Sequence, residues 1–251
     1  MFSPPPRILL LCLACALSSP AAAEETRGPS AGPTPASCVP EVDTLPGDAA
    51  GEACEHPDAW FWSVRNVLAE PPELLRLVDP NHGLDENYEP DNLVELSEAA
   101  GNVRTVGRQR VTARTGEALS RMVRAAGEDG VELVVSSTYR SFNRQKTLHA
   151  YWIDELGESL ARAVSAPPGH SQHQLGTTVD FAPVGRAFED TPADRWLRNN
   201  AWHYGFSLSY PRGYEKLTGY NYESWHYRYI GGAGTYVEMR YFDGVQQHML
   251  E

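Results

Sequence analysis

The chain has 251 residues, of which 41% are hydrophobic and 22% are charged, and its formal net charge is −12. These values are typical of one globular domain of ordinary size, and they exclude a disordered chain or a bundle of membrane helices. The acidic balance also argues against nucleic acid as a partner, because binding to the phosphate backbone needs a basic surface. We expect a monomeric acidic domain.

The first 23 residues have the layout of a secretory signal peptide. Arg7 precedes an apolar run over residues 8–17, and three small residues at 21–23 precede an acidic pair. The run is about half of the roughly 20 residues that span a bilayer, so we expect cleavage after Ala23, export, and no membrane span afterwards. Cys15 could mark a lipoprotein, but Cys12 stands where an aliphatic residue is expected. Lipid anchoring is therefore the less favoured alternative to free export into the periplasm or cell-wall space.

Residues 24–57 are rich in Pro, Gly, Ala, Ser and Thr without apolar periodicity, which predicts a linker or tethered extension. This segment holds Cys38 and Cys54, the two cysteines that remain after signal cleavage. An even pair in an exported chain predicts a disulfide, which would contribute roughly 3 kcal/mol for a loop of this size. Two free thiols are the alternative. The folded domain is expected over residues 58–251.

Helical and extended patterns are mixed along this domain without a regular repeat. Apolar spacing and end signals predict helices over residues 59–68, before Pro71, and 115–126, before Gly127. Further helices are expected at 142–156, capped by Ser141, and at 190–205, with Pro192 in the first turn. Residues 84–96 read as an extended connection, and strands are predicted at 131–139, 177–183, 206–210 and 225–231. This order favours an α+β fold, in which a small antiparallel sheet carries the chemistry and helices flank it.

The stretch PPGHSQHQLGTTVDF at residues 167–181 contains two candidate metal ligands. His173 and Asp180 are seven residues apart, so one continuous strand would point them to opposite faces. A turn at Gly176 would place His173 in the loop before the strand, and both side chains could then face one point. Because histidine and carboxylate are common zinc ligands, this stretch predicts half of a metal site.

The stretch ESWHYRY at residues 223–229 offers the other half. In a strand, His226 and Arg228 share one face, and the aromatic residues beside them pack on the other. Glu223 at the strand entrance could reach a water molecule at the metal without binding the metal, which suits a general base. Taken singly, each histidine is more often a packed or surface residue, but the two segments together favour a catalytic metal site.

These segments resemble the VanY-type D-alanyl-D-alanine carboxypeptidases, zinc metallopeptidases related to the VanX-type dipeptidases. The family pattern S-x-H-x-x-G-x-(A/T)-x-D is matched by residues 171–180, and its E-x-W-H by residues 223–226. The upstream pattern S-x-Y-R-S-x-x-x-Q is matched by residues 137–145. The motifs come in the expected order, and the resemblance covers about residues 84–232.

The resemblance implies one zinc ion held by His173, Asp180 and His226, with Glu223 as the catalytic base. It also implies that Arg140 stabilises the developing oxyanion or holds the substrate carboxylate, since a planar guanidinium suits either task. A structural salt bridge is the alternative for Arg140.

Three further residues, Tyr139, Gln145 and Ser171, match family positions near the substrate. The resemblance thus implies an exported zinc carboxypeptidase that removes the terminal D-alanine from peptidoglycan stem peptides. The same site would also suit an L,D-carboxypeptidase or a peptidoglycan endopeptidase. A zinc-stabilised binding module without activity is the alternative from another class of protein, and Glu223 argues against it, because a pure binder would not need a base.

Overall fold

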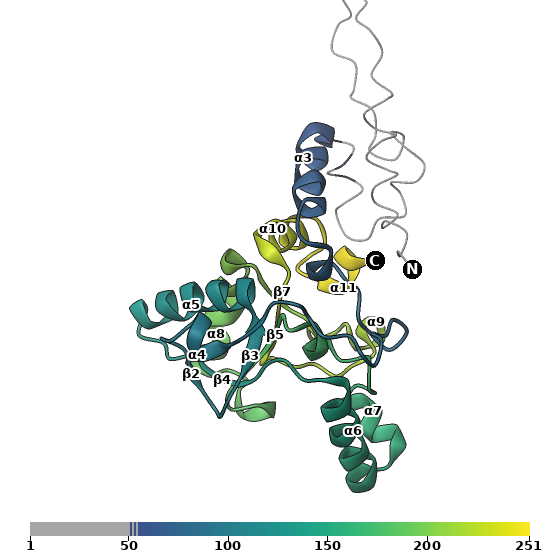
Figure 1. Cartoon of the computed structure of the whole chain (residues 1–251). Helices are drawn as coiled ribbons and strands as arrows, with labels where there is room; N and C mark the ends of the chain where they lie inside the picture. Colours follow the sequence, from purple (N-terminus) through teal and green to yellow (C-terminus); the bar gives the residue numbers. More distant parts are fainter. Residues whose placement is uncertain (1–50, 52, 54) are drawn as a thin grey trace, which may run out of the picture.

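The structure is a computed structural model, which describes residues 51, 53 and 55–251. The predicted signal peptide and the pair Cys38 and Cys54 lie outside the described residues. A sheet forms the centre of the described part, with α5 and α8 on one side, α3, α10 and α11 at one end, and the α6–α7 hairpin projecting from the other (Figure 1). This mixture confirms the predicted α+β class.

The central sheet has five strands in the order β2-β4-β5-β7-β6. Their bounds are Arg104–Thr105 for β2, Val134–Ser137 for β4, Thr178–Phe181 for β5, Phe206–Leu208 for β6 and His226–Tyr229 for β7. All neighbours pair antiparallel except β2 and β4, which are parallel. A separate antiparallel pair joins β1 (Leu93–Glu95) to β3 (Arg110–Thr112). The predicted antiparallel arrangement around the site is therefore confirmed, and the parallel edge strand β2 adds to it.

All four predicted helices are present. They are α3 (Pro57–Leu68), α5 (Ala113–Glu128), α6 (Phe142–Leu156) and α8 (Pro192–Asn200), and the last is followed by a 3-10 turn, Ala201–Tyr204. The expected cap is also present, since the Ser141 side chain accepts a hydrogen bond from the Arg144 amide. Helices that the sequence did not predict are α4 (Leu96–Ala99), α7 (Glu158–Val164), α9 (Glu215–Thr218), α10 (Gly231–Tyr241) and α11 (Gln246–Leu250).

No helix within residues 51, 53 and 55–251 has both the length and the apolar character needed to cross a bilayer.

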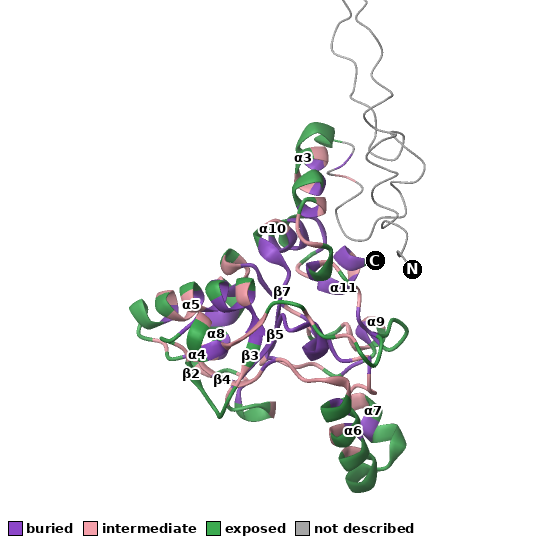
Figure 2. Ribbon diagram, viewed as in Figure 1, coloured by how far each residue is buried: buried purple, intermediate pink, exposed green. Residues whose placement is uncertain are grey.

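Strand alternation separates a hydrophobic face of the sheet from the face that carries the site. Val179 and Phe181 of β5 and Tyr227 of β7 are buried in the main core, which α5 and α8 cover. Asp180 and His226 alternate with them and therefore project from the opposite face. Figure 2 shows both strands buried while the outer surfaces of α5 and α6 are exposed. The core thus fixes the strands from which the site side chains project.

A second hydrophobic cluster joins α3, α10 and α11. The rings of Trp60 and Tyr241 meet edge to face with centroids 4.8 Å apart, and Phe242 and Leu250 are buried beside them. Ala53, within the segment that the sequence predicts as a linker, is also buried in this cluster. The boundaries of the extension and the domain stay predictions, but this residue is packed before position 58.

Arg228 holds the chain between α3 and β1 against the site face of the sheet. Its side chain is fully buried, and Nη2 donates hydrogen bonds to the carbonyls of Leu74 (3.0 Å) and Arg76 (2.8 Å). Burial lowers the pKa of this guanidinium to about 10. The residue that shares a strand face with His226 therefore acts as a structural anchor.

Candidate active site

Two of the predicted ligands are a cross-strand pair. Asp180 of β5 lies opposite His226 of β7 in the antiparallel register, and such partners project from the same face of a sheet. His173 comes from the 3-10 turn Gln172–Leu175, which ends at Gly176 with a left-handed φ of 70°. A Cβ at Gly176 would lie 2.8 Å from Leu93 Cδ2. The predicted turn at Gly176 is confirmed, and glycine is required there both for its conformation and for its lack of a side chain.

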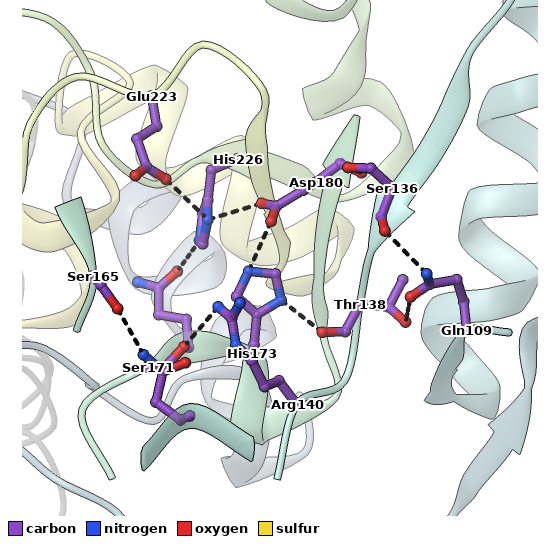
Figure 3. Close-up of polar contacts among 12 residues, drawn as sticks. Gln109, Ser136, Thr138, Arg140, Ser165, Ser171, His173, Asp180, Glu223 and His226 are labelled. Carbon is purple, nitrogen blue, oxygen red and sulfur yellow. Dashed lines mark hydrogen bonds and ion pairs between the residues drawn. The ribbon is translucent and has the colours of Figure 1, made fainter. Parts of the chain in front are cut away.

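The three side chains converge on one point (Figure 3). Asp180 Oδ2 lies 3.1 Å from His173 Nε2, and Asp180 Oδ1 lies 3.1 Å from His226 Nδ1. All three residues are buried, and one candidate ligand atom from each lies within 4.8 Å of the others. The structure therefore brings together the three residues that the two sequence segments supply.

A backbone carbonyl fixes the orientation of His173. Its Nδ1 lies 2.6 Å from the carbonyl of Thr138, which can only accept, so Nδ1 carries the proton and Nε2 presents a lone pair toward Asp180. The Thr138 hydroxyl in turn donates to Gln109 Oε1 (3.0 Å), and the Gln109 amide donates to the carbonyl of Ser136 (3.0 Å). This arrangement, visible in Figure 3, is typical of histidines that bind metal.

A glutamine has the same role for His226. His226 Nε2 lies 3.2 Å from Gln172 Oε1 and donates its proton to it, so Nδ1 is the nitrogen that faces Asp180. Glu223 Oε2 lies 3.3 Å from the same Nδ1. The sequence did not predict a role for Gln172, Thr138 or Gln109. Gln172 lies between two motif residues and could have been suspected, whereas the Thr138 carbonyl leaves no trace in a side-chain pattern.

The buried site shifts the pKa values of its members in different directions. Burial lowers the pKa of His173 to about 4. Burial opposes ionisation of Asp180, but the two histidines outweigh it and hold the pKa of this carboxyl well below its usual range. Burial also acts to lower the pKa of His226, but the carboxylates of Asp180 and Glu223 raise it to about 9. Without a metal, His226 is therefore protonated at neutral pH, and a cation bound there would take the place of that proton.

The donor set fits a zinc ion. Two imidazole nitrogens and one carboxylate are the three protein ligands of many catalytic zinc sites, which keep a fourth position open. Each histidine gives its second nitrogen to an acceptor, Thr138 or Gln172, and so offers the remaining nitrogen to the metal. His173, Asp180 and His226 therefore suit a metal with preference for nitrogen and oxygen ligands.

The three residues line a cleft of about 730 Å³, together with Arg140, Ser171 and Glu223. This volume is in the range of sites for small ligands. Arg140 is half-buried, its Nη2 lies 3.5 Å from Ser171 Oγ, and its buried Nε has no partner among the described residues. Burial lowers the pKa of Arg140, although Asp180 and Glu223 act to raise it. A guanidinium with an unused donor at the cleft wall suits an anionic substrate group.

The other two predicted substrate contacts, Tyr139 and Gln145, lie outside the lining of the cleft. Gln145 is buried and donates to Ser165 Oγ and to the carbonyl of Ala166, which themselves line the cleft. The guanidinium of Arg110 lies over the ring of Tyr139, with Arg110 Cζ 4.9 Å from the ring centroid. Neither is among the cleft-lining residues. A direct contact of either with substrate stays a prediction, and Gln145 also supports the cleft wall.

Comparison with known proteins points to one family. A profile described as VanY, D-alanyl-D-alanine carboxypeptidase, matches residues 108–232. The bifunctional D-Ala-D-Ala dipeptidase and D-Ala-D-Ala carboxypeptidase VanXYC of Enterococcus gallinarum is 34% identical over 166 residues, which are 62% of this chain and 83% of the relative. The chain spans 65% and 35% of the lengths of two other curated relatives, from Bacillus subtilis (strain 168) and Enterococcus faecium.

Two solved structures have the same fold and substantial identity. The LdcB LD-carboxypeptidase is 32% identical with a TM-score of 0.65, over 72% of this chain and 87% of that one. A mutant of the vancomycin-resistance D,D-pentapeptidase VanY, solved in complex with Zn(II), is 26% identical with a TM-score of 0.60, over 71% of this chain and 99% of that one. The chain belongs to the VanY family of D-alanyl-D-alanine carboxypeptidases.

Proposed function

We propose that the protein is a carboxypeptidase with one zinc ion that removes the terminal D-alanine from peptidoglycan stem peptides. The observation that carries the proposal is the convergence of His173, Asp180 and His226 in a cleft, with Glu223 3.3 Å from His226 Nδ1. Three facing ligands and an adjacent carboxylate make up the parts of a metallopeptidase site. The VanY relative with Zn(II) supports the choice of metal.

The ligands and Glu223 would divide the work of hydrolysis. His173, Asp180 and His226 would hold the ion, which supplies Lewis-acid polarisation of the scissile carbonyl and lowers the pKa of water. Glu223 Oε2 lies 3.3 Å from His226 Nδ1, and the Glu223 side chain is 18% exposed and lines the cleft. It would take a proton from the attacking water and pass it to the leaving amine. A catalytic carboxylate at this position distinguishes an enzyme from a binding module.

Arg140 would bind the anionic part of the substrate. Its guanidinium lies in the cleft wall beside Ser171, and burial strengthens any ion pair that it makes there. Either the terminal carboxylate or the developing oxyanion fits this cation. We propose Ser171, whose hydroxyl is already within 3.5 Å of Arg140 Nη2, as a further contact of the same substrate group.

An L,D-carboxypeptidase is the second candidate, and the similarity to LdcB favours it. Both activities release a terminal D-alanine and differ in the residue before it. We further propose that the chain acts outside the cytoplasm, since peptidoglycan is the proposed substrate and residues 1–23 have the layout of a signal peptide. We also propose that it acts as a monomer.

Purified protein incubated with muropeptides that end in tri-, tetra- and pentapeptides would separate these candidates. We expect the mass of one alanine to be lost from the pentapeptide, and the loss to stop in the presence of a metal chelator. Loss only from the tetrapeptide would establish the L,D activity instead. Cleavage inside the stem would identify an endopeptidase, and no chelator-sensitive product from any substrate would contradict the proposal.

A further inference from the structure

We propose that Gln246, in the C-terminal helix α11, is a positioning residue for the metal site and acts through Gln172. The proposal rests on the metal-binding role given above to His226. Its basis is a buried chain of side chains that runs from His226 through Gln172 and Gln246 to Ser209, all of them less than 5% exposed. The family profile ends at residue 232, so Gln246 lies outside the matched segment.

Along this chain of side chains, each amide has one orientation in the structure. Gln172 Nε2 donates to Gln246 Oε1 at 3.2 Å, so Gln172 Oε1 is the atom that faces His226 Nε2. Gln246 Nε2 donates to Ser209 Oγ at 3.4 Å, and Gln246 Oε1 accepts from Gln172. Ser209 is also bonded to His226 through the backbone, since the Ser209 amide donates to the His226 carbonyl (3.3 Å). The chain therefore begins and ends at the same metal ligand.

The orientation of the Gln172 amide matters for the metal because it selects the nitrogen of His226. An acceptor opposite Nε2 keeps the proton on Nε2 and leaves Nδ1 to face Asp180 and the ion. A rotated amide would place a donor there instead, and would favour the tautomer whose Nδ1 carries the proton and cannot bind a metal. Gln246 opposes this rotation, because its Oε1 accepts a hydrogen bond from the Gln172 amide nitrogen and would face an oxygen if Gln172 rotated.

The position of Gln246 depends on how α11 is attached to the molecule. Met249 and Leu250 are buried in the cluster with α3 and α10, and Gln247 Nε2 donates to Asp79 Oδ2 at 2.8 Å. These contacts hold the helix independently of the bond from Gln246 to Gln172. Loss of the Gln246 amide should therefore change the site without detaching the helix.

The test measures zinc affinity of the full chain by competition with a chromophoric chelator, after the protein has been stripped of metal. We expect Gln246→Met, which keeps the volume but removes the acceptor, to weaken zinc binding about tenfold, and Gln172→Met to weaken it by at least as much, as is typical for partners of ligating histidines. Gln246→Glu keeps an oxygen for the Gln172 amine and should bind zinc as the unaltered protein does. The absorption spectrum of the cobalt form should change in the two Met variants and not in Gln246→Glu.

Gln247→Met is the matched control, since it removes a neighbouring buried amide and its bond to Asp79 but no contact to Gln172, while Met249 and Leu250 still hold α11. Its zinc affinity should stay within about twofold of the unaltered protein, and thermal unfolding of the stripped variants would check that each is folded. Equal zinc affinity for Gln246→Met and the unaltered protein, or equal weakening by Gln246→Met and Gln247→Met, would overturn the proposal. If the unaltered protein bound no zinc, the proposed function would fail first.

Discussion

In the proposed mechanism, Glu223 takes part in catalysis and not in binding of the metal. Its carboxylate lies 3.3 Å from His226 Nδ1, while Asp180 and His173 complete the ligand set without it. A base that takes no part in binding can be removed while the metal site stays intact. This separation leads to a prediction for one substitution.

Glu223→Gln should bind one equivalent of zinc and lose D-alanine release by at least about 100-fold, the lower limit of what a general base contributes. The amide keeps the shape of the side chain but cannot accept the proton of water. Elemental analysis of the purified variant would give its zinc content, and a D-alanine assay its turnover. Turnover equal to that of the unaltered protein would show that another group is the base.

Glu238 is a buried carboxyl on α10 that the proposed mechanism does not use. Burial raises its pKa to about 8, although the hydrogen bond from the Ser207 hydroxyl (2.6 Å) acts to lower it. The carboxyl is thus protonated in the folded protein at neutral pH, while in the unfolded chain it ionises near its usual pKa of 4.5. Because the folded state binds the additional proton, the free energy of unfolding should fall as pH rises through this interval.

Glu238→Gln should remove this contribution, which amounts to at most about 1.4 kcal/mol per pH unit between roughly pH 4.5 and 8. Urea unfolding of the variant and the unaltered protein at pH 5, 6, 7 and 8 would show the difference in slope. The variant should gain relative stability toward pH 8. Parallel stability curves for the two proteins would mean that Glu238 is not held in its neutral form.

At the scale of elements, the turn before β5 and the end of α5 both need a left-handed glycine. Gly176 has a φ of 70° and would place a Cβ 2.8 Å from Leu93 Cδ2 and 3.3 Å from Pro90 Cγ. Gly130 has a φ of 74°, and nothing lies within 4 Å of a Cβ built there. The two glycines therefore have nearly the same backbone conformation, but only Gly176 lacks space for a Cβ.

Gly130→Ala should cost about 1 kcal/mol, the conformational penalty alone, and Gly176→Ala about 2–3 kcal/mol because crowding is added. Gly176→Ala should also weaken zinc binding, since the turn positions His173. Chemical denaturation and zinc titration of both variants would check this. Equal destabilisation by the two substitutions would show that the packing around Gly176 relaxes freely.

Sequence patterns predicted elements where local and tertiary preferences agree. The helix α5 has a continuous apolar stripe, and α6 has the Ser141 cap, so both could be predicted from their own residues. The helix α10 could not, because it begins with Gly231-Gly-Ala-Gly, which disfavours helix, and it is stabilised by packing against α3. Strand β2 has two exposed residues and carries no signal of its own.

The spacing of residues within the sequence motifs predicted the three candidate ligands but not the residues that orient them. His173, Asp180 and His226 could be assembled from two segments because strand alternation and the turn at Gly176 determine their directions. The partner of Gln172 could be found only in the folded chain, since Gln172 and Gln246 are 74 residues apart. Contacts to backbone carbonyls, such as that of Thr138 with His173, are set by the fold and leave no side-chain pattern.

At the scale of the whole molecule, two hydrophobic clusters support one cleft. The main core under the sheet positions β5 and β7, and the cluster of α3, α10 and α11 places the C-terminal helix behind the turn that contains His173. Both clusters therefore support the residues that we propose as metal ligands. This arrangement predicts that zinc binding stabilises the entire described part of the chain, because the ion binds only the folded state.

The requirement for one zinc ion is tested by titrating metal-stripped protein with zinc and measuring D-alanine release from a pentapeptide muropeptide. Release should be absent without metal, should rise in proportion to added zinc, and should level off at one equivalent. Asp180→Asn, which loses the central carboxylate between the two histidines, should show little release at one equivalent. Full release from the stripped protein, or a plateau that needs more than one zinc ion per chain, would contradict a carboxypeptidase that works with one zinc ion.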